Sequence, residues 1–239
     1  MVIRMWPTEI IEGWPGNCCV LPRDKENNMK KRIILGSASP RRSELLAQIG
    51  VEFEVRVSEK EEIYKSSIPE EIVKELSLMK AENVASELGE DIAYDPAGNT
   101  LDPDVCIKDT VVIGADTIVV LDDEILGKPV DEEDAVRMIT RLQGREHWVY
   151  TGVAVLNFGP DGAKTVTNYP VGTKVYVNAM TEEEIRAYVE TKDPLDKAGS
   201  YGIQGRFAAY IDRIDGDYYN VVGLPVSRVY QTLREIGAI

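Results

Sequence analysis

Ile33-Ile34-Leu35-Gly36-Ser37-Ala38-Ser39-Pro40-Arg41-Arg42 is the stretch that decides the fold of this chain. Its apolar beginning predicts a strand, and the Ser43–Gly50 segment that follows has helical spacing and a terminal glycine. Pro40 suits the first turn of that helix, because the N–H group that proline lacks would have no partner there. The stretch therefore predicts a strand, a tight turn and a helix.

Two hydroxyl groups and two guanidinium groups stand at the predicted start of this helix, on Ser37, Ser39, Arg41 and Arg42. A helix N-terminus offers free N–H groups and partial positive charge, so the combination can bind phosphate oxygens. The glycine spacings of the Walker-type loop and of the dinucleotide fingerprint are both absent. The alternative is a solvated helix start with two surface arginines, and these ten residues alone favour neither.

Composition and charge exclude several classes of protein. The chain has 239 residues, 44% of them hydrophobic, and a formal net charge of -14. Such an acidic chain is a poor candidate for binding long nucleic acid, and it has no apolar run long enough to span a membrane. Its one histidine, His147, excludes a multi-histidine metal site. Cys18, Cys19 and Cys106 lack zinc spacing, and no signal peptide is evident, which predicts a reduced, cytoplasmic setting.

The rest of the chain alternates helices and strands without a strict order. Residues 1–31 predict an irregular N-terminal extension, and residues 89–109 a surface insertion rich in Gly, Pro, Asp and Asn. Helices are expected at 69–88, after Asp131, after the Thr181/Glu184 capping box and at 226–236. Strands are expected at 53–57, 110–121, 148–158, 164–178 and 207–214, with a hairpin turn at 215–216. This mixture predicts an α/β fold with a mixed sheet.

Asp116 interrupts the most apolar run of the chain, at 110–121. A carboxylate in a buried strand is costly unless it is paired or binds a metal. Gly114 beside it allows another group to approach the backbone closely. A strand-end aspartate that caps local backbone is the alternative, but we favour a functional role because buried carboxylates cluster at sites.

Six motifs stand in the order found in the Maf family, which the chain resembles over residues 32 to 237. They are Ser37–Arg42, Gly114–Thr117, Gly127–Pro129, Gly144–His147, Asp196–Gly205 and Gly216–Pro225. The resemblance implies a Maf/ITPase-like architecture, also described as anticodon-binding-like, in which helices flank a mixed twisted sheet with a deep cleft. It also implies one Maf-like domain at 32–239, Mg²⁺ or another divalent cation such as Mn²⁺, and a cytoplasmic homodimer.

The activity that the resemblance implies is house-cleaning hydrolysis of a nucleoside triphosphate between its α and β phosphates, releasing the monophosphate and pyrophosphate. By position, Asp116 matches the family's proton acceptor. The positions that the family ties to base choice are occupied here by Arg41, Thr117 and Gln204. This is the pattern of the subfamily that acts on dTTP and UTP. CTP and modified uridine nucleotides are further candidate substrates. The residues that match polar positions of the family's cleft are Ser37, Arg42, Lys80, Lys128 and the acidic Glu62. The added N-terminal and 89–109 segments exceed the usual bacterial length but displace no motif.

In this interpretation the basic side chains and a metal ion held by Glu62 and Asp116 offset the charge of the triphosphate. Asp116, Lys128 and Glu62 are the catalytic candidates, and Ser39 joins the substrate-binding set. Without the family, Lys128 would be taken for a turn lysine and Lys80 for a surface lysine of a helix. Two alternative functions stay open: a nucleotide-binding regulator of cell division or septum formation without turnover, and a house-cleaning enzyme for purine nucleotides.

Overall fold

The computed structural model describes residues 31–92 and 107–239. Most of the extension predicted at 1–31, the centre of the predicted insertion and all three cysteines lie outside the described residues. In the part that is described, no helix combines the length and apolar character needed to cross a membrane.

The elements follow one another as β1 (Arg32–Gly36), α1 (Pro40–Gln48), β2 (Glu54–Val55), α2 (Pro69–Ile92), β3 (Thr110–Leu121), β4 (Glu124–Leu126), α3 (Glu132–Leu142), β5 (Glu146–Phe158), β6 (Lys164–Val177), α4 (Glu182–Val189), three short 3-10 helices (Asp193–Asp196, Ala198–Ser200 and Arg206–Tyr210), β7 (Ile211–Asp215), α5 (Tyr218–Val222) and α6 (Val226–Glu235). Within the described residues, seven strands form one sheet in the order β2-β1-β3-β5-β6-β7, with β4 pairing to β3. β1 runs parallel to β2 and β3, and the remaining pairs are antiparallel. The predicted mixed α/β sheet is confirmed.

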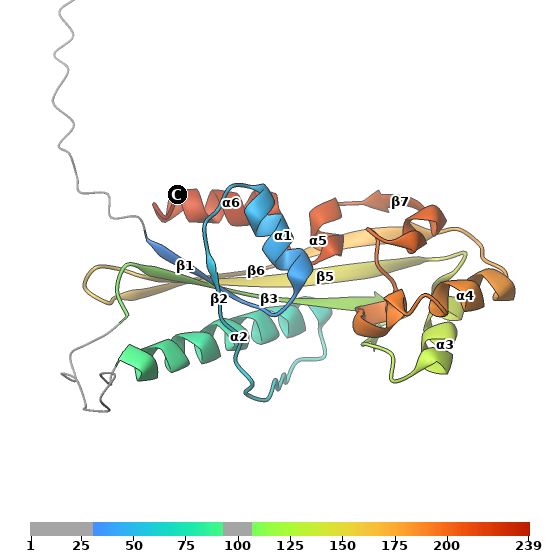
Figure 1. Cartoon of the computed structure of the whole chain (residues 1–239), viewed down its shortest axis with the longest axis horizontal. Coiled ribbons are helices and arrows are strands. Elements are labelled where there is room, and N and C mark those ends of the chain that lie inside the picture. Colours follow the sequence, from blue (N-terminus) through green and yellow to red (C-terminus); the bar gives the residue numbers. More distant parts are fainter. Residues whose placement is uncertain (1–30, 93–106) are drawn as a thin grey trace, which may run out of the picture.

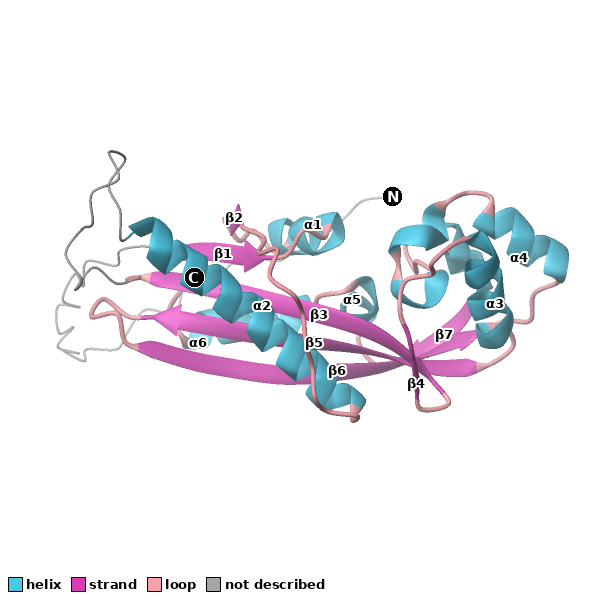
Figure 2. Ribbon diagram, turned by 90° about the horizontal axis from the view of Figure 1, so that it is seen from below, coloured by secondary structure: helices cyan, strands magenta, loops and turns pink. Residues whose placement is uncertain are grey.

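Helices cover both faces of the sheet (Figure 1). α1, α5 and α6 lie on one face, where Leu46 and Leu233 pack against Leu35, Ile113 and Val153 of the strands. α2 crosses the other face, and α3 and α4 gather at the far end of the long strands (Figure 2). The apolar side chains of each helix thus find a sheet surface to cover, as amphipathic elements require.

Two glycines allow α2 to lie directly on the sheet. A Cβ atom on Gly152 of β5 would stand 2.0 Å from the carbonyl oxygen of Val73, and one on Gly114 of β3 would stand 2.2 Å from that of Ser77. Both distances are far below any real contact, so a side chain at either position would push α2 away. The prediction that Gly114 permits close approach is confirmed, and the approaching group is the backbone of α2.

The edge of β3 is unpaired at its centre, and this gap positions the site. β1 pairs with β3 from Thr110 only as far as Gly114, and β4 pairs with it from Val119 onward. Asp116 and Thr117 fall between the two pairings. Since successive strand residues face opposite sides of a sheet, the two side chains reach the gap from opposite faces.

Five local features differ from the prediction. The helix predicted at 69–88 continues to Ile92, so the insertion begins later than expected. Residues 206–210 form a 3-10 helix that buries Phe207, and the strand is limited to Ile211–Asp215. No hairpin turn follows, because the Asp217 side chain accepts a hydrogen bond from the Tyr219 N–H group and starts α5. The strand predicted at 53–57 is reduced to Glu54–Val55, and β4 was not predicted.

Candidate active site

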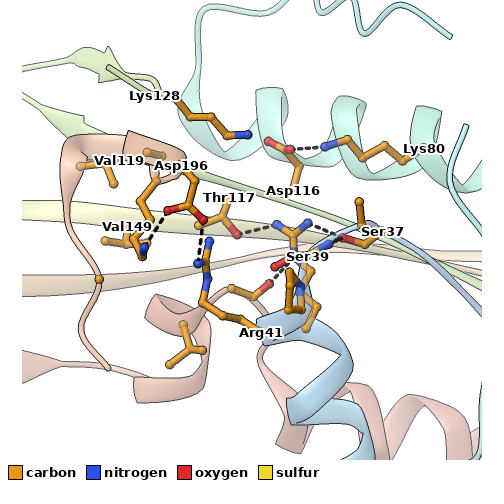
Figure 3. Close-up of a pocket in the computed structure, with 18 of the residues that line it drawn as sticks. Ser37, Ser39, Arg41, Lys80, Asp116, Thr117, Val119, Lys128, Val149 and Asp196 are labelled. Atoms are coloured by element: carbon orange, nitrogen blue, oxygen red, sulfur yellow. Dashed lines mark hydrogen bonds and ion pairs between the residues drawn. The ribbon is translucent and has the colours of Figure 1, made fainter. Parts of the chain in front are cut away.

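A cleft of about 660 Å³ opens where β1 ends and the edge of β3 is unpaired. Its walls come from the β1–α1 turn, from α2, from the centre of β3 and from the 193–205 segment (Figure 3). The volume lies within the usual range for small-molecule sites, about 300–1,000 Å³. All ten residues singled out from the sequence line it: Ser37, Ser39, Arg41, Arg42, Glu62, Lys80, Asp116, Thr117, Lys128 and Gln204. The structure therefore brings the whole predicted set together.

Arg42 is fixed on one wall by three neutral acceptors. Its Nε donates to the Gly223 carbonyl at 2.8 Å, its Nη1 to Ser37 Oγ at 2.9 Å and its Nη2 to Thr117 Oγ1 at 3.0 Å. Burial lowers the pKa of Arg42, and the charge of Asp116 opposes that shift. A guanidinium has five N–H groups, so two are left for a ligand in the cleft. The guanidinium is thereby pre-oriented without being neutralised.

Lys80 and Asp116 form an ion pair at the opposite wall. Lys80 Nζ stands 2.5 Å from Asp116 Oδ1 and 3.1 Å from Glu62 Oε2. Only 14% of the Asp116 side chain is exposed, against 46% for Glu62, so Asp116 is the more shielded carboxylate. α2 supplies Lys80 because its close packing on Gly114 and Gly152 places this turn beside β3. The costly charge predicted in the strand is thus compensated by a lysine.

Arg41 extends across the mouth of the cleft. Its Nη1 donates to Asp196 Oδ2 at 3.3 Å (Figure 3). Asp196 also pairs with Lys197, whose Nζ donates to Asp193 as well. Burial acts to raise the pKa of Asp196, but hydrogen bonds and charge from Lys197 and Arg41 outweigh it and hold that pKa below its usual value. The pair joins the first turn to the 193–205 segment.

The predicted site residues not yet described are Lys128, Gln204 and Ser39. Lys128 points toward Asp116 from the side opposite Lys80 (Figure 3), and it forms no ion pair within residues 31–92 and 107–239. Gln204 is exposed on the 193–205 wall. Ser39 is the N-cap residue of α1, but its side chain makes no capping bond; instead its N–H group donates to Ser37 Oγ at 3.3 Å.

Sequence reasoning missed two buried residues behind the site. Thr151 lies opposite Thr117 in the β3–β5 register, and their hydroxyl oxygens are 2.9 Å apart. Asn220 of α5 accepts a hydrogen bond from Thr151 through its backbone carbonyl. Thr151 in the 148–158 strand and Asn220 within the Gly216–Pro225 motif were the available signals, but only the folded structure shows that they meet behind Thr117. His147 of the Gly144–His147 motif is buried, and its Nε2 lies 2.7 Å from the Tyr201 hydroxyl.

Comparison with known proteins places this site in a family. The Maf-like protein family model matches residues 32–236, and the chain therefore belongs to the Maf family. A relative from Agathobacter rectalis named dTTP/UTP pyrophosphatase is 51% identical over 86% of this chain and 98% of its own length. Relatives of the same name from Bacillus cereus and Lachnoclostridium phytofermentans are 47% and 44% identical, over 88% and 86% of this chain and 93% and 95% of their own lengths.

Among solved structures, the Staphylococcus aureus Ham1 protein is 15% identical, with a TM-score of 0.37, over 62% of this chain and 72% of its own. That similarity is too low to bear on the fold or the site.

Proposed function

We propose that this chain hydrolyses dTTP and UTP to the monophosphate and pyrophosphate, as a house-cleaning activity. The observation that carries the proposal is that one cleft unites the Ser37–Arg42 turn with the Asp116–Lys80 pair. The first provides oriented donors for phosphate, and the second a carboxylate beside them. Relatives named dTTP/UTP pyrophosphatase, similar over nearly their full length, support the same activity.

The donor set fits a divalent cation of the Mg²⁺ type. Glu62 and Asp116 both contact the ammonium of Lys80, so their oxygens converge on a common region. Mg²⁺ is commonly held by one or two carboxylates together with water and substrate phosphates. The described residues contain no group of three or more metal-ligating side chains, so phosphate oxygens would complete the coordination. Mg²⁺ or Mn²⁺ bound there supplies positive charge against the triphosphate and makes water more acidic.

The side chains divide the reaction between them. Arg42 and Lys128 bind phosphate oxygens, since neither is paired with a carboxylate in the described part of the chain. Asp116 accepts the proton of the water that attacks the α-phosphorus. The new bond joins the water oxygen to the α-phosphorus, and the bond to the bridging α–β oxygen breaks. Pyrophosphate leaves with that oxygen, and basic side chains near it stabilise its charge.

We assign base choice to Gln204, Arg41 and Thr117. Gln204 offers both a donor and an acceptor, which fits the edge of a pyrimidine. Arg41 and Thr117 line the same cleft. Their pattern favours dTTP and UTP over purine nucleotides.

A Mg²⁺-dependent panel of nucleotides with chromatographic separation of products tests the proposal. UMP and pyrophosphate from UTP, and dTMP and pyrophosphate from dTTP, are expected. UDP and phosphate would contradict the bond that we propose is cleaved. Tight binding of UTP without any product would favour a division regulator, and faster release of pyrophosphate from purine nucleotides would favour the purine alternative.

The homodimer and the cytoplasmic location stay predictions. Light scattering after size-exclusion chromatography tests the first, with twice the 26.6 kDa chain mass expected.

A further inference from the structure

A line of hydrogen bonds runs from the cleft into the core behind Thr117. Arg42 Nη2 donates to Thr117 Oγ1 at 3.0 Å, and Thr117 Oγ1 lies 2.9 Å from Thr151 Oγ1. Thr151 Oγ1 in turn lies 3.0 Å from the Asn220 carbonyl oxygen. Thr151 and Asn220 are both 0% exposed, so water does not compete for these contacts. Thr117 is the member of this line that faces the cleft.

The direction of each hydrogen bond follows from the chemistry of its ends. A carbonyl oxygen can only accept, so the one hydroxyl proton of Thr151 is donated to Asn220. Thr151 then has no proton for Thr117, and the contact between the two hydroxyls requires Thr117 to donate to Thr151. The reverse arrangement would set two lone pairs against each other in a buried site, at the cost of an unmade hydrogen bond.

α5 keeps the inner end of the line in place. The Asn220 side-chain amide donates to the Val149 carbonyl at 3.1 Å and to Thr173 Oγ1 at 3.0 Å. The carbonyl of Gly223, just after α5, is the acceptor for Arg42 Nε. The same short helix therefore fixes both Arg42 and the carbonyl that orients Thr151.

Thr117 consequently has no proton to offer a ligand. Its proton goes to Thr151, one lone pair receives Arg42, and one lone pair is left. We propose that Thr151 and Asn220 are positioning residues that make the Thr117 hydroxyl an obligatory hydrogen-bond acceptor, so that this wall of the cleft selects nucleotides presenting an N–H or O–H donor. The inference rests on the proposed function and adds a physical basis for the choice of nucleotide.

Two donors of a uridine nucleotide have the required chemistry. Uracil and thymine carry a proton on ring nitrogen N3, whereas cytosine has a lone pair there. The sugar 3′-hydroxyl is the second candidate. CTP lacks the first donor and 3′-deoxy-UTP lacks the second, so the two analogues distinguish the sources.

The test compares kcat/KM for UTP, CTP and 3′-deoxy-UTP in the wild type, Thr151→Val and Thr151→Ser. Valine keeps the shape of threonine but removes the hydroxyl, which frees the Thr117 proton to point into the cleft. Serine keeps the hydroxyl. Thr232→Val is the matched control, because Thr232 is also buried but donates within α6 to Arg228.

The wild type is expected to prefer UTP over one of the two analogues by about tenfold, the usual effect of one neutral hydrogen bond. Thr151→Val should remove most of that preference, while Thr151→Ser and Thr232→Val retain it. A general structural defect would lower activity toward all three nucleotides without changing their ratios. Near-UV circular dichroism checks the fold, and if Thr151→Val does not fold, Thr151→Ala is measured by the same criterion.

Two results would overturn the inference while leaving the proposed function intact. One is a wild type that hydrolyses UTP but prefers it over neither analogue. The other is a folded variant without the Thr151 hydroxyl whose two ratios stay within twofold of the wild type. Failure of the wild type to release pyrophosphate from UTP or dTTP would instead refute the proposed function, and the inference with it.

Discussion

Arg42→Lys is the substitution that most directly tests the construction of the cleft. The arginine donates to Gly223, Ser37 and Thr117 at 2.8, 2.9 and 3.0 Å, in three directions from one planar group. A lysine ammonium keeps the charge, but it lacks the three separate donors Nε, Nη1 and Nη2. It can therefore reach at most one of these acceptors. Two hydrogen bonds from a charged donor are lost, at about 1.5 kcal/mol each. The free energy of unfolding should therefore fall by about 3 kcal/mol.

The neighbouring substitution Arg41→Lys provides the comparison. Arg41 makes one ion pair, to Asp196, and the two side chains are 31% and 64% exposed. Pairs of that kind contribute about 1 kcal/mol or less. Urea denaturation followed by circular dichroism measures both variants. Equal destabilisation by the two substitutions, or a loss below about 1 kcal/mol for Arg42→Lys, would refute the role given to the three acceptors.

Three further predictions follow from single features. Asp116→Asn should lower kcat for UTP by about 1,000-fold, with nucleotide binding by calorimetry retained, because the proton acceptor is lost. Gly152→Ala should destabilise the protein by about 3 kcal/mol in urea denaturation, since its Cβ would meet the Val73 carbonyl, whereas Gly89→Ala, which has open space, should not. Burial lowers the pKa of His147 from 6.5 to about 4. Between pH 4 and pH 6.5 the unfolded chain therefore binds a proton at His147 that the folded chain does not bind. Stability should accordingly decline as pH falls from 6.5 toward 4, by up to about 3 kcal/mol, and His147→Gln should show a shallower decline in denaturation at each pH.

Sequence periodicity was sufficient for the elements that bury a regular apolar face. The strand and helix at the first turn, the long helix α2 and the central strand β3 appear where they were predicted. The Asp131 cap and the Thr181/Glu184 capping box are confirmed as well, because such caps depend on residues three positions apart.

The errors have two physical causes, tertiary contacts and an element too short to show a period. Phe207 sits in a 3-10 turn because its ring packs against Tyr201 and against Tyr188, which belongs to α4. α5 is only five residues long and begins at a single cap, too short for a periodic signal. Pairing of Thr117 with Thr151 likewise depends on the β3–β5 register, which no local pattern specifies. The Phe207 turn and the Thr117–Thr151 pairing are decided by contacts outside the local sequence, whereas α5 depends on one local cap.

Basic side chains of the cleft differ in how much charge they leave for an anion, and this difference explains how a chain of net charge -14 can hold a triphosphate. Lys80 faces two carboxylates and Arg41 faces one, so much of their charge is already balanced. Arg42 is held by a carbonyl and two hydroxyls, which orient the guanidinium without neutralising it. Neutral acceptors around Arg42 therefore serve the proposed function better than an ion pair would, because a phosphate does not first have to displace a carboxylate.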